Sequence, residues 1–260
     1  MITYFKLLFA SILTIFLILF SWKSTYDYNC YMLVFPLMLL LIISHSFIEL
    51  KMKERLCFKS CYFKANSLFA KLLSSKIAVS IFYVVVSIMM SISALSGVIE
   101  YPQKLWLYLL IHTILIIFLY KYFYFIFKNT IRDSYRSILA REWAINIGAI
   151  FLIGVFIYIS INGYEPTYLQ SSLQETILVA SNSISSGCSI VNYILKLKIE
   201  IDSLFWWIVT QSSNGINNQL AQLGIWLGFL FINSLALLGI NRFMAQIIYL
   251  LDKLFQRRQS

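Results

Sequence analysis

Apolar and polar residues alternate along this chain of 260 residues in long blocks, and six of the apolar blocks are long enough to cross a membrane. They cover about residues 4–22, 31–48, 77–98, 105–127, 143–161 and 220–240. Each holds about 18 residues or more, and a helix of that length spans roughly 30 Å of hydrocarbon. The pattern predicts an all-α integral membrane protein, a single membrane domain over residues 1–260 in which about six transmembrane helices form a bundle.

Two further segments are amphipathic and basic. Residues 51–76 interleave lysines with apolar residues at roughly helical spacing, which indicates a helix that lies on an anionic leaflet or docks an acidic partner. The tail repeats the pattern, with an apolar stripe over residues 243–255 that is followed by Arg257 and Arg258. We expect both segments to lie on the same face of the membrane as interfacial amphipathic helices.

The longest connection separates the fifth and sixth blocks, and it predicts an amphipathic hairpin over residues 167–210. Its first half has a helical apolar stripe, and residues 195–202 follow with the sequence LKLKIEID. That alternation is typical of a strand, but the same residues also fit a helix with i,i+4 ion pairs. We favour the helix, because a single strand would leave its edges without a partner. The hairpin is expected on the outer leaflet, with Trp206 and Trp207 as its anchor.

Composition indicates that the bilayer is the solvent of this chain, and the charges give an orientation. Hydrophobic residues make up 60% of the chain and charged residues 12%, against about a quarter charged in soluble proteins. Seventeen lysines and arginines fall on one side of the predicted spans and four on the other. Because basic loops stay in the cytoplasm, we expect both termini there, in a bacterial inner membrane. The net charge of +10 then indicates attraction to an anionic cytoplasmic leaflet and not to nucleic acid.

Polar residues inside the apolar blocks are few. None of the eleven acidic residues lies in the middle of a block, so we expect no buried carboxylate that would mark an ion site or a proton relay. His112 lies near the middle of its block, and Asn146 and Asn233 lie in two others. The simpler interpretation is that these side chains make hydrogen bonds between helices, and the alternative is a polar path through the bilayer.

Four cysteines suggest one pairing. Cys30 and Cys188 are the only two on the expected outer side of the membrane. In an oxidising compartment they could form a disulfide that pins the hairpin to the second span. Two free thiols are the alternative, because a thiol is also stable in an apolar segment.

The sequence predicts no enzyme. It has no phosphate-binding glycine loop, no HExxH and no paired aspartate motif, and both histidines lie in apolar blocks. Cys57 and Cys61, with His45 and Glu49 nearby, could supply four zinc ligands, but the spacing is unspecific and free cysteines are common in apolar segments. We therefore expect no catalytic residue, no metal and no cofactor.

These patterns favour a non-enzymatic accessory, assembly or scaffold subunit of a membrane complex, with a membrane or periplasmic protein as its partner. Docking is expected at the outer hairpin, through Leu169, Leu173, Ile177, Trp206 and Trp207. The alternative is a small transporter or channel with a polar path near His112, Asn146 and Asn233. A third hypothesis is a protective protein whose exposed loops block a toxin by direct contact.

Overall fold

A computed structural model describes residues 2–62, 76–101, 103–161, 166–215 and 219–257 of the chain. Within these ranges the chain forms helices and turns but no strand. Six helices in this part are long and apolar enough to cross a membrane. They are α1 (Ile2–Thr25), α2 (Val34–Tyr62), α4 (Lys76–Glu100), α5 (Gln103–Ile126), α6 (Asp133–Ile161) and α9 (Gln219–Arg257). The predicted all-α membrane protein is confirmed.

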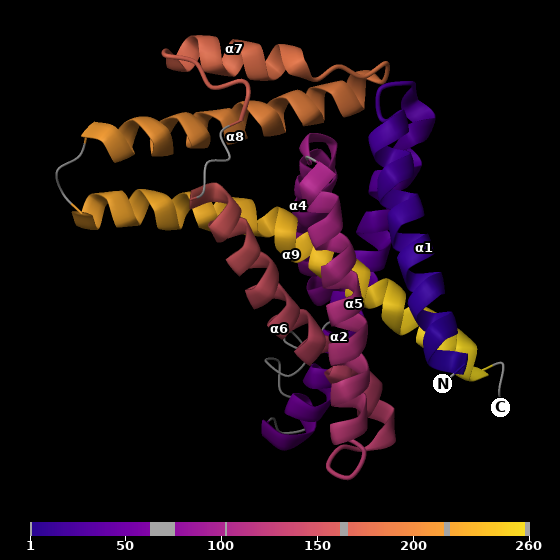
Figure 1. Ribbon diagram of the computed structural model, residues 1–260. Coiled ribbons are helices and arrows are strands. Elements are labelled where there is room, and N and C mark those ends of the chain that lie inside the picture. The colour runs from indigo at the N-terminus through magenta and orange to yellow at the C-terminus, as the bar shows by residue number, and fades with distance from the viewer. Residues whose placement is uncertain (1, 63–75, 102, 162–165, 216–218, 258–260) are drawn as a thin grey trace.

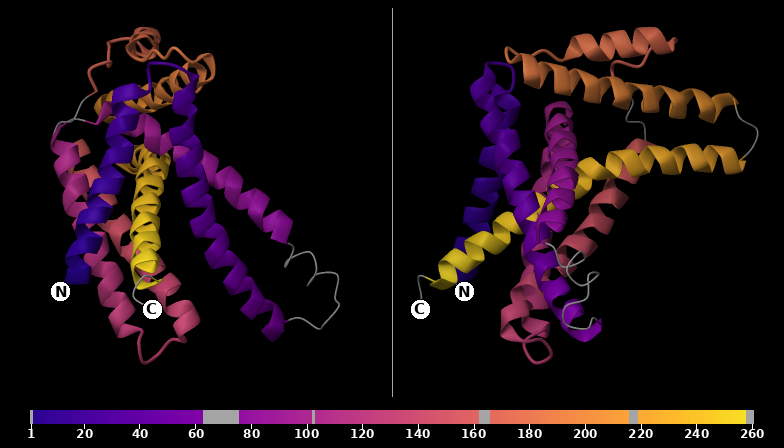
Figure 2. Two further views of the ribbon diagram at one scale, coloured as in Figure 1. Left: turned by 90° about the vertical axis from the view of Figure 1, so that its right-hand side faces the viewer. Right: turned by 180° about the vertical axis from the view of Figure 1, so that it is seen from behind.

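The spans run alternately in opposite directions and leave the two termini at one end of the bundle (Figure 1). The other end is covered by α7 (Leu173–Ser183) and α8 (Ser189–Gly215), which lie across it with α7 outermost. We call the end with α7 and α8 the outer end, and the end with the termini the inner end. α8 and the first half of α9 extend together beyond the bundle on one side (Figure 2).

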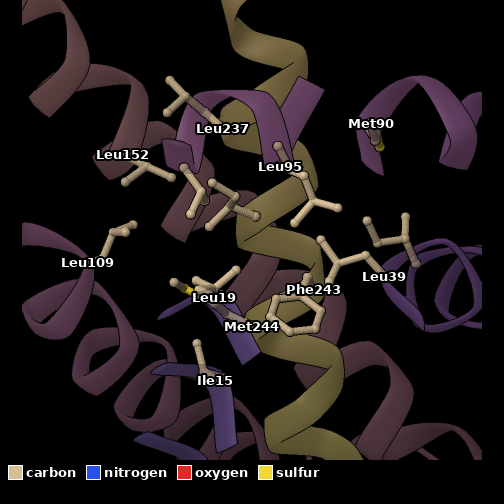
Figure 3. Packing of buried hydrophobic residues seen from close by; sticks show 14 of the residues in the cluster. Ile15, Leu19, Leu39, Met90, Leu95, Leu109, Leu152, Leu237, Phe243 and Met244 are labelled. Carbon is tan, nitrogen blue, oxygen red and sulfur yellow. The ribbon is translucent and has the colours of Figure 1, made fainter. Parts of the chain in front are cut away.

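α9 is the axis of the bundle. Its C-terminal half passes among the other spans, and the helix contacts α1, α2, α4, α5 and α6. Phe243 and Met244 are fully buried in the cluster that also contains Leu39 of α2 and Leu95 of α4 (Figure 3). The expectation that the tail after Arg242 lies on the membrane surface is therefore wrong. An amphipathic stripe fits a lipid surface or a protein groove equally well, and here five neighbouring helices provide the groove.

Hydrogen bonds to backbone carbonyls tie the spans together. Ser91 on α4 donates its hydroxyl to the carbonyl of Pro36 on α2, at 3.1 Å. Trp22, which is buried near the end of α1, donates its indole N–H to the carbonyl of Leu95 at 2.9 Å. Lipid offers no alternative partner to these polar groups, so the bonds help to hold α4 against both α1 and α2.

The connection between α2 and α4 is described only in part. Lys51 and Glu54 form an exposed ion pair at 2.6 Å near the end of α2. The helix continues to Tyr62, but its side chains after Arg55 lie outside the described part of the chain, as do residues 63–75. Most of the surface helix predicted over residues 51–76, and the thiols of its two cysteines, therefore fall outside the described residues.

The outer hairpin is helical on both sides. α7 begins after Ser172, whose hydroxyl accepts a hydrogen bond from the N–H of Glu175 at 3.2 Å in a helix N-cap. Residues 195–202 lie within α8, so the helical interpretation of LKLKIEID is confirmed. Lys198 and Asp202 form one of the ion pairs that the i,i+4 spacing predicts.

Candidate functional site

Two arginines and two glutamates form a network inside the bundle. Arg141 and Glu142 come from α6, Arg242 from α9 and Glu49 from α2, so the network joins three spans. Arg141 bridges Glu49 and Glu142, at 2.9 Å from each. Arg242 reaches the other oxygen of Glu142, also at 2.9 Å. The side chain of Arg141 is completely buried, so these interactions are screened much less than those of surface charges.

Neutral side chains extend the network on both sides. Gln246 on α9 accepts a hydrogen bond from Arg141 at 2.7 Å and donates one to Nδ1 of His45 at 3.1 Å. Tyr249, one turn further along α9, donates its hydroxyl to Glu49 at 2.9 Å. The charged groups therefore have partners on every side, which is the condition for burying them at low cost.

The network is electrically balanced, with two guanidinium groups facing two carboxylates. Ser46 on α2 adds two further bonds, accepting from Arg141 at its carbonyl (3.1 Å) and from Arg242 at its hydroxyl (3.0 Å). A charge in hydrocarbon costs several kcal/mol unless a partner and hydrogen bonds offset the loss of water. Complete pairing therefore fixes the relative positions of α2, α6 and α9.

The sequence pattern did not predict that these carboxylates lie inside the spans. Glu49, Glu142 and Asp252 lie at the ends of apolar blocks, yet all three lie within helices that qualify as spans. α6 begins at Asp133, so Glu142 lies more than two turns inside it. The expectation of no buried carboxylate is therefore wrong, because a span can start before its apolar block when its charges find partners inside the bundle. The adjacent Arg141 and Glu142, directly before an apolar block, were the signal in the sequence.

A second, partly buried ion pair lies nearer the inner end. Lys121 on α5 binds Asp252 on α9 at 2.5 Å, and Tyr120 donates its hydroxyl to the same carboxylate at 3.1 Å. Tyr120 and Asp252 line a polar cavity of about 260 Å³, whose wall also includes Glu49 and Tyr249. This inner cavity therefore connects the second ion pair with the arginine network.

His112 is buried on α5 and binds Asn241 of α9. Its Nε2 donates to the side-chain oxygen of Asn241 at 3.0 Å, and Asn241 donates to the carbonyl of Ile145 at 2.7 Å. Gly148 on α6 allows this contact, because a Cβ there would lie 2.9 Å from the Asn241 oxygen and 2.2 Å from Ile116. The pair is a polar link between α5, α6 and α9.

The three intramembrane polar residues singled out in the sequence do not share one site. Asn146 is exposed on the outside of the bundle. Asn233 is half-buried in the outer half of α9, where it donates to the carbonyl of Phe229 at 3.0 Å. The structure thus forms no polar path through His112, Asn146 and Asn233. Asn241, which follows the last apolar block, takes the place beside His112.

A second cavity, of about 80 Å³, lies under α8 at the outer end. Lys198 and Asp202 line it from α8, and Glu100 from the end of α4. Leu152 and Leu237 of the apolar cluster line it from α6 and α9 (Figure 3). Burial raises the pKa of the Asp202 carboxyl above its ordinary value, and the paired Lys198 opposes that shift only in part. The outer cavity therefore combines an apolar wall with two carboxylates and one ammonium group.

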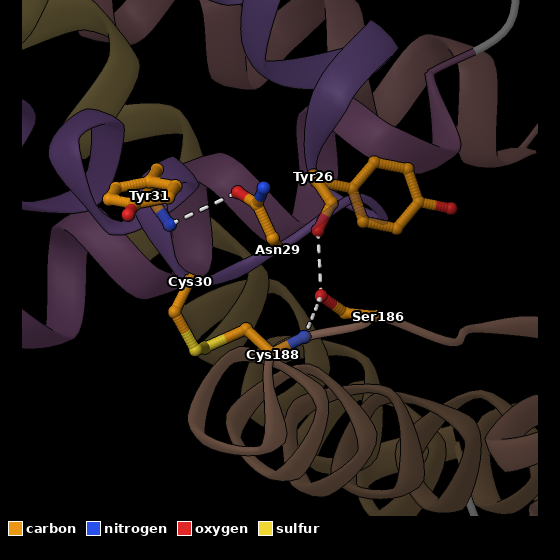
Figure 4. The surroundings of a disulfide bond; sticks show 6 residues. All are labelled: Tyr26, Asn29, Cys30, Tyr31, Ser186 and Cys188. Atoms are coloured by element: carbon orange, nitrogen blue, oxygen red, sulfur yellow. Dashed lines mark hydrogen bonds between the residues drawn. A yellow bond between two sulfur atoms is a disulfide. The ribbon is translucent and has the colours of Figure 1, made fainter.

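A disulfide joins the hairpin to the start of the second span (Figure 4). It links Cys30, the first residue of the short 3-10 helix η1 (Cys30–Leu33), to Cys188, which precedes α8. The pairing raised from the sequence is thus present in the structure. Cys188 is completely buried whereas Cys30 is exposed, so the bond links the surface of the outer end to the packed start of α8.

Hydrogen bonds hold the same junction. Ser186 donates its hydroxyl to the carbonyl of Tyr26 at 2.7 Å. Gly187 donates its N–H to the carbonyl of Asp27 at 2.7 Å, and a Cβ at this position would lie 2.1 Å from the carbonyl oxygen of Tyr28. Only glycine fits this close backbone approach. The hairpin is therefore held to the segment between α1 and α2 by the disulfide at Cys30 and by hydrogen bonds to Tyr26 and Asp27.

The side chains expected to dock a partner are used mainly within the chain. Trp206 is buried against Phe229 of α9, with the two ring centroids 4.6 Å apart. The other four are only partly exposed, and they are Leu169, Leu173, Ile177 and Trp207. A helix that lies over a bundle buries its most apolar face first, which is why the strongest apolar stripe in the sequence meets the chain itself.

The buried charged groups orient three helices relative to one another. Within the described part of the chain, no group of three or more histidine, cysteine, aspartate or glutamate residues is arranged to hold a metal ion. No protein-family model, curated protein or solved structure matches the chain.

Proposed function

We propose that this polytopic membrane protein is a non-enzymatic scaffold or assembly subunit of a larger membrane complex. The observation that carries the proposal is an exposed apolar stripe along α8. The stripe consists of Ile190, Tyr193, Leu197 and Ile201, and Tyr193 is 70% exposed. The residues follow one another at intervals of three and four, so they form one ridge along the helix.

The α8 stripe suits an apolar helix of another membrane protein. Ridges of this kind pack into the grooves of a second helix, and exposed apolar surface on an otherwise paired element commonly marks an interaction site. Other parts of α8 are already in contact with α7 on one side and α9 on another (Figure 1). The disulfide between Cys30 and Cys188 holds one end of α8 in place, so the stripe is presented on a fixed support.

We also propose that the inner end faces the cytoplasm of a bacterial inner membrane, against an anionic leaflet. The support is the position of both termini at the inner end, together with the excess of lysine and arginine in the connections at that end. The α8 stripe would then meet its partner in the outer leaflet or at the periplasmic surface.

The scaffold proposal can be tested by photo-crosslinking in the native host. A photoreactive residue at Tyr193 or Leu197 should yield one discrete crosslinked protein. The same residue at Phe118, which is 57% exposed on the flank of α5, is the matched control and should yield lipid adducts only. In the presence of a crosslinker at Tyr193, the substitution Leu197→Asp should remove the product without lowering the amount of folded chain. Lipid adducts alone at both stripe positions would contradict the proposal.

A second candidate function, a small transporter or channel, is favoured by one polar face of α9. This face runs from the middle of the bundle to the inner cavity and carries Asn241, Arg242, Gln246, Tyr249, Asp252 and Gln256. About two helical turns, with the buried Leu237 midway between them, separate Asn241 from Asn233 in the outer cavity. A path for protons would therefore need to open at only one point.

Proton flux into liposomes distinguishes the two candidates. If the chain transports protons, purified protein should acidify liposomes under an imposed gradient, and His112→Ala and Asn241→Leu should each lower the rate. A scaffold should give the same rate as empty liposomes, with or without these substitutions. A variant at Asn146, which is exposed away from the polar face of α9, is the matched control.

A further inference from the structure

The outer cavity contains an acidic oxygen without a partner. Asp202 uses one carboxylate oxygen, Oδ2, to bind Lys198. Its other oxygen, Oδ1, is buried and has no hydrogen-bond partner among the described residues. Buried polar atoms in native proteins nearly always have a partner, so this oxygen points to a donor from outside the chain.

Other acceptors lie on the same wall. Glu100 adds a second carboxylate, and it lies close enough to Asp202 and Lys198 for their charges to act on it. The side-chain nitrogen of Asn233 donates a hydrogen bond to the carbonyl of Phe229, so the side-chain oxygen can accept one from a ligand. The cavity thus offers acceptors from three residues, whereas its one ammonium group is already bound to Asp202.

The charge of the cavity selects the sign of the ligand. Two carboxylates and one lysine give a net charge of about −1 when all three groups are ionised. Two carboxylates close together disfavour each other's ionised form, and a cation between them removes that penalty. The same two carboxylates would repel an anion. A positively charged hydrogen-bond donor therefore fits the cavity, and an acidic ligand does not.

The size and the walls of the cavity limit the rest of the ligand. A volume of about 80 Å³ corresponds to roughly five to eight water-sized groups, at about 10–15 Å³ for each. Leu152, Phe156 and Leu237 supply apolar wall. The ligand should therefore carry its charge at one end and a short apolar chain at the other.

We propose that the outer cavity binds a small primary alkylamine in its ammonium form. The three N–H groups of the ammonium match Asp202 Oδ1, the Glu100 carboxylate and the Asn233 oxygen, and the alkyl chain lies against Leu152 and Leu237. The proposal goes beyond the scaffold function and does not depend on it, because binding to the purified chain requires no partner protein.

The test is a titration of the purified full chain, in mild detergent at about pH 7, with n-butylamine followed by ligand-observed NMR. We expect saturable binding with a Kd on the order of millimolar, as suits a ligand of about five non-hydrogen atoms. n-Butanol and n-butyrate have the same length, and both should bind at least about tenfold more weakly. Equal binding of butyrate, or no saturable binding of the amine, would overturn the proposal.

Variants separate the charged site from nonspecific binding to apolar surface. Asp202→Asn and Glu100→Gln should each weaken amine binding by at least about tenfold, because each removes one charge-assisted hydrogen bond. Glu175→Gln removes an exposed carboxylate from α7 of the same hairpin and should leave the binding unchanged.

A fourth variant leaves every charge in place. Ala236→Leu fills the cavity from α9 and should abolish binding of the amine. An intact disulfide and an unchanged unfolding temperature show that each variant is folded. If folded Asp202→Asn and Ala236→Leu both bind the amine as the wild type does, the amine does not occupy this cavity and the proposal fails.

Discussion

Arg141 occupies a position that only arginine suits. Its guanidinium group contacts Glu49, Glu142 and Gln246 at once, and it lies 4.9 Å from the centre of the Tyr249 ring. A planar fork with five N–H groups can serve partners in several directions, whereas the ammonium of lysine is a compact point charge on a flexible stem. The position therefore selects for geometry as well as for charge.

Arg141→Leu should lower the free energy of unfolding by about 3–5 kcal/mol, because it leaves buried carboxylates without their main partner. Arg141→Lys should restore only part of the loss. Chemical unfolding in mild detergent measures both effects. Arg132→Leu removes an exposed arginine just before α6, and it should change stability by no more than about 0.5 kcal/mol. Equal effects of the two leucine variants would show that the network does not hold the bundle together.

The raised pKa of Asp202 gives stability a defined dependence on pH. The folded chain holds this proton more tightly than the unfolded chain, whose carboxyl titrates near the ordinary value of 3.8. The contribution is therefore complete below that value, and it is lost as pH rises through the folded pKa. The charged groups beside Asp202 are Lys198, one turn before it on α8, and Glu100 at the end of α4, and both remain in the variant described next.

We expect the stability of the wild type, measured relative to Asp202→Asn, to fall as pH rises from the ordinary carboxyl value of 3.8 through the raised pKa of the folded chain. Asparagine does not titrate, so the difference between the two chains isolates residue 202 from the other carboxylates. Unfolding temperatures recorded across this pH range in one detergent provide the measurement. A difference that stays flat would mean that the carboxyl of Asp202 is not desolvated as the structure has it.

At the scale of the element, two glycines of α6 provide a matched pair. A Cβ at Gly148 would meet Ile116 and Asn241, while a Cβ at Gly154 would meet nothing within 4 Å. Gly148→Ala should destabilise the chain by about 1–3 kcal/mol, because α6 would have to move away from α5 and α9. Gly154→Ala should be neutral or stabilising by up to about 1 kcal/mol, because alanine favours the helix. Thermal unfolding of the two variants side by side tests the close packing at Gly148.

Apolar blocks in the sequence locate the spans because a bilayer demands about 20 apolar residues for each of them. They place the ends poorly where charges pair inside the bundle. α6 starts at Asp133, ahead of the block at 143–161, and α9 continues to Arg257, far past the block that ends at 240. The amphipathic pattern of the tail in particular predicts a surface helix, because the sequence does not show which spans lie beside it.

The contacts of the arginine network could not be predicted from the sequence, for a different reason. Arg141 and Glu49 are separated by 92 positions, and Arg242 and Ser46 by 196. No pattern of spacing within one helix reports contacts at such distances. The Cys30–Cys188 pair could be suggested because cysteine has one obvious kind of partner. A glutamate has many, so the sequence alone does not choose among them.

At the scale of the whole molecule, polar groups and cavities are distributed along α9. The inner half of the bundle holds paired charges beside a polar cavity, and the outer half holds a small cavity closed by α8. Between them lies the apolar cluster around Leu95 and Leu237 (Figure 3). Buried apolar side chains of α9, such as Leu237 and Ile240, therefore separate the polar groups of the two halves, which suits a static scaffold and a closed transporter alike.

The orientation of the molecule can be tested with single cysteines in intact cells. We expect a membrane-impermeant maleimide to label Glu175→Cys at the outer end directly. Asp133→Cys, at the start of α6 and 87% exposed at its side chain, should react only after lysis, because in the proposed orientation the basic inner end faces the cytoplasm. Both variants carry serine at positions 57 and 61, so that no other free thiol responds. The reverse labelling pattern would invert the proposed orientation.

The disulfide also has a consequence for biosynthesis. Cys30 emerges from the ribosome 158 residues before Cys188. The segments α2, α4, α5, α6 and α7 lie between the two cysteines, so the bond cannot close until all of them have been made. A closed bond therefore shows that the chain was made at least as far as the hairpin. A reduced Cys30 identifies chains that stopped on the way, and a simple thiol assay on nascent material would count them.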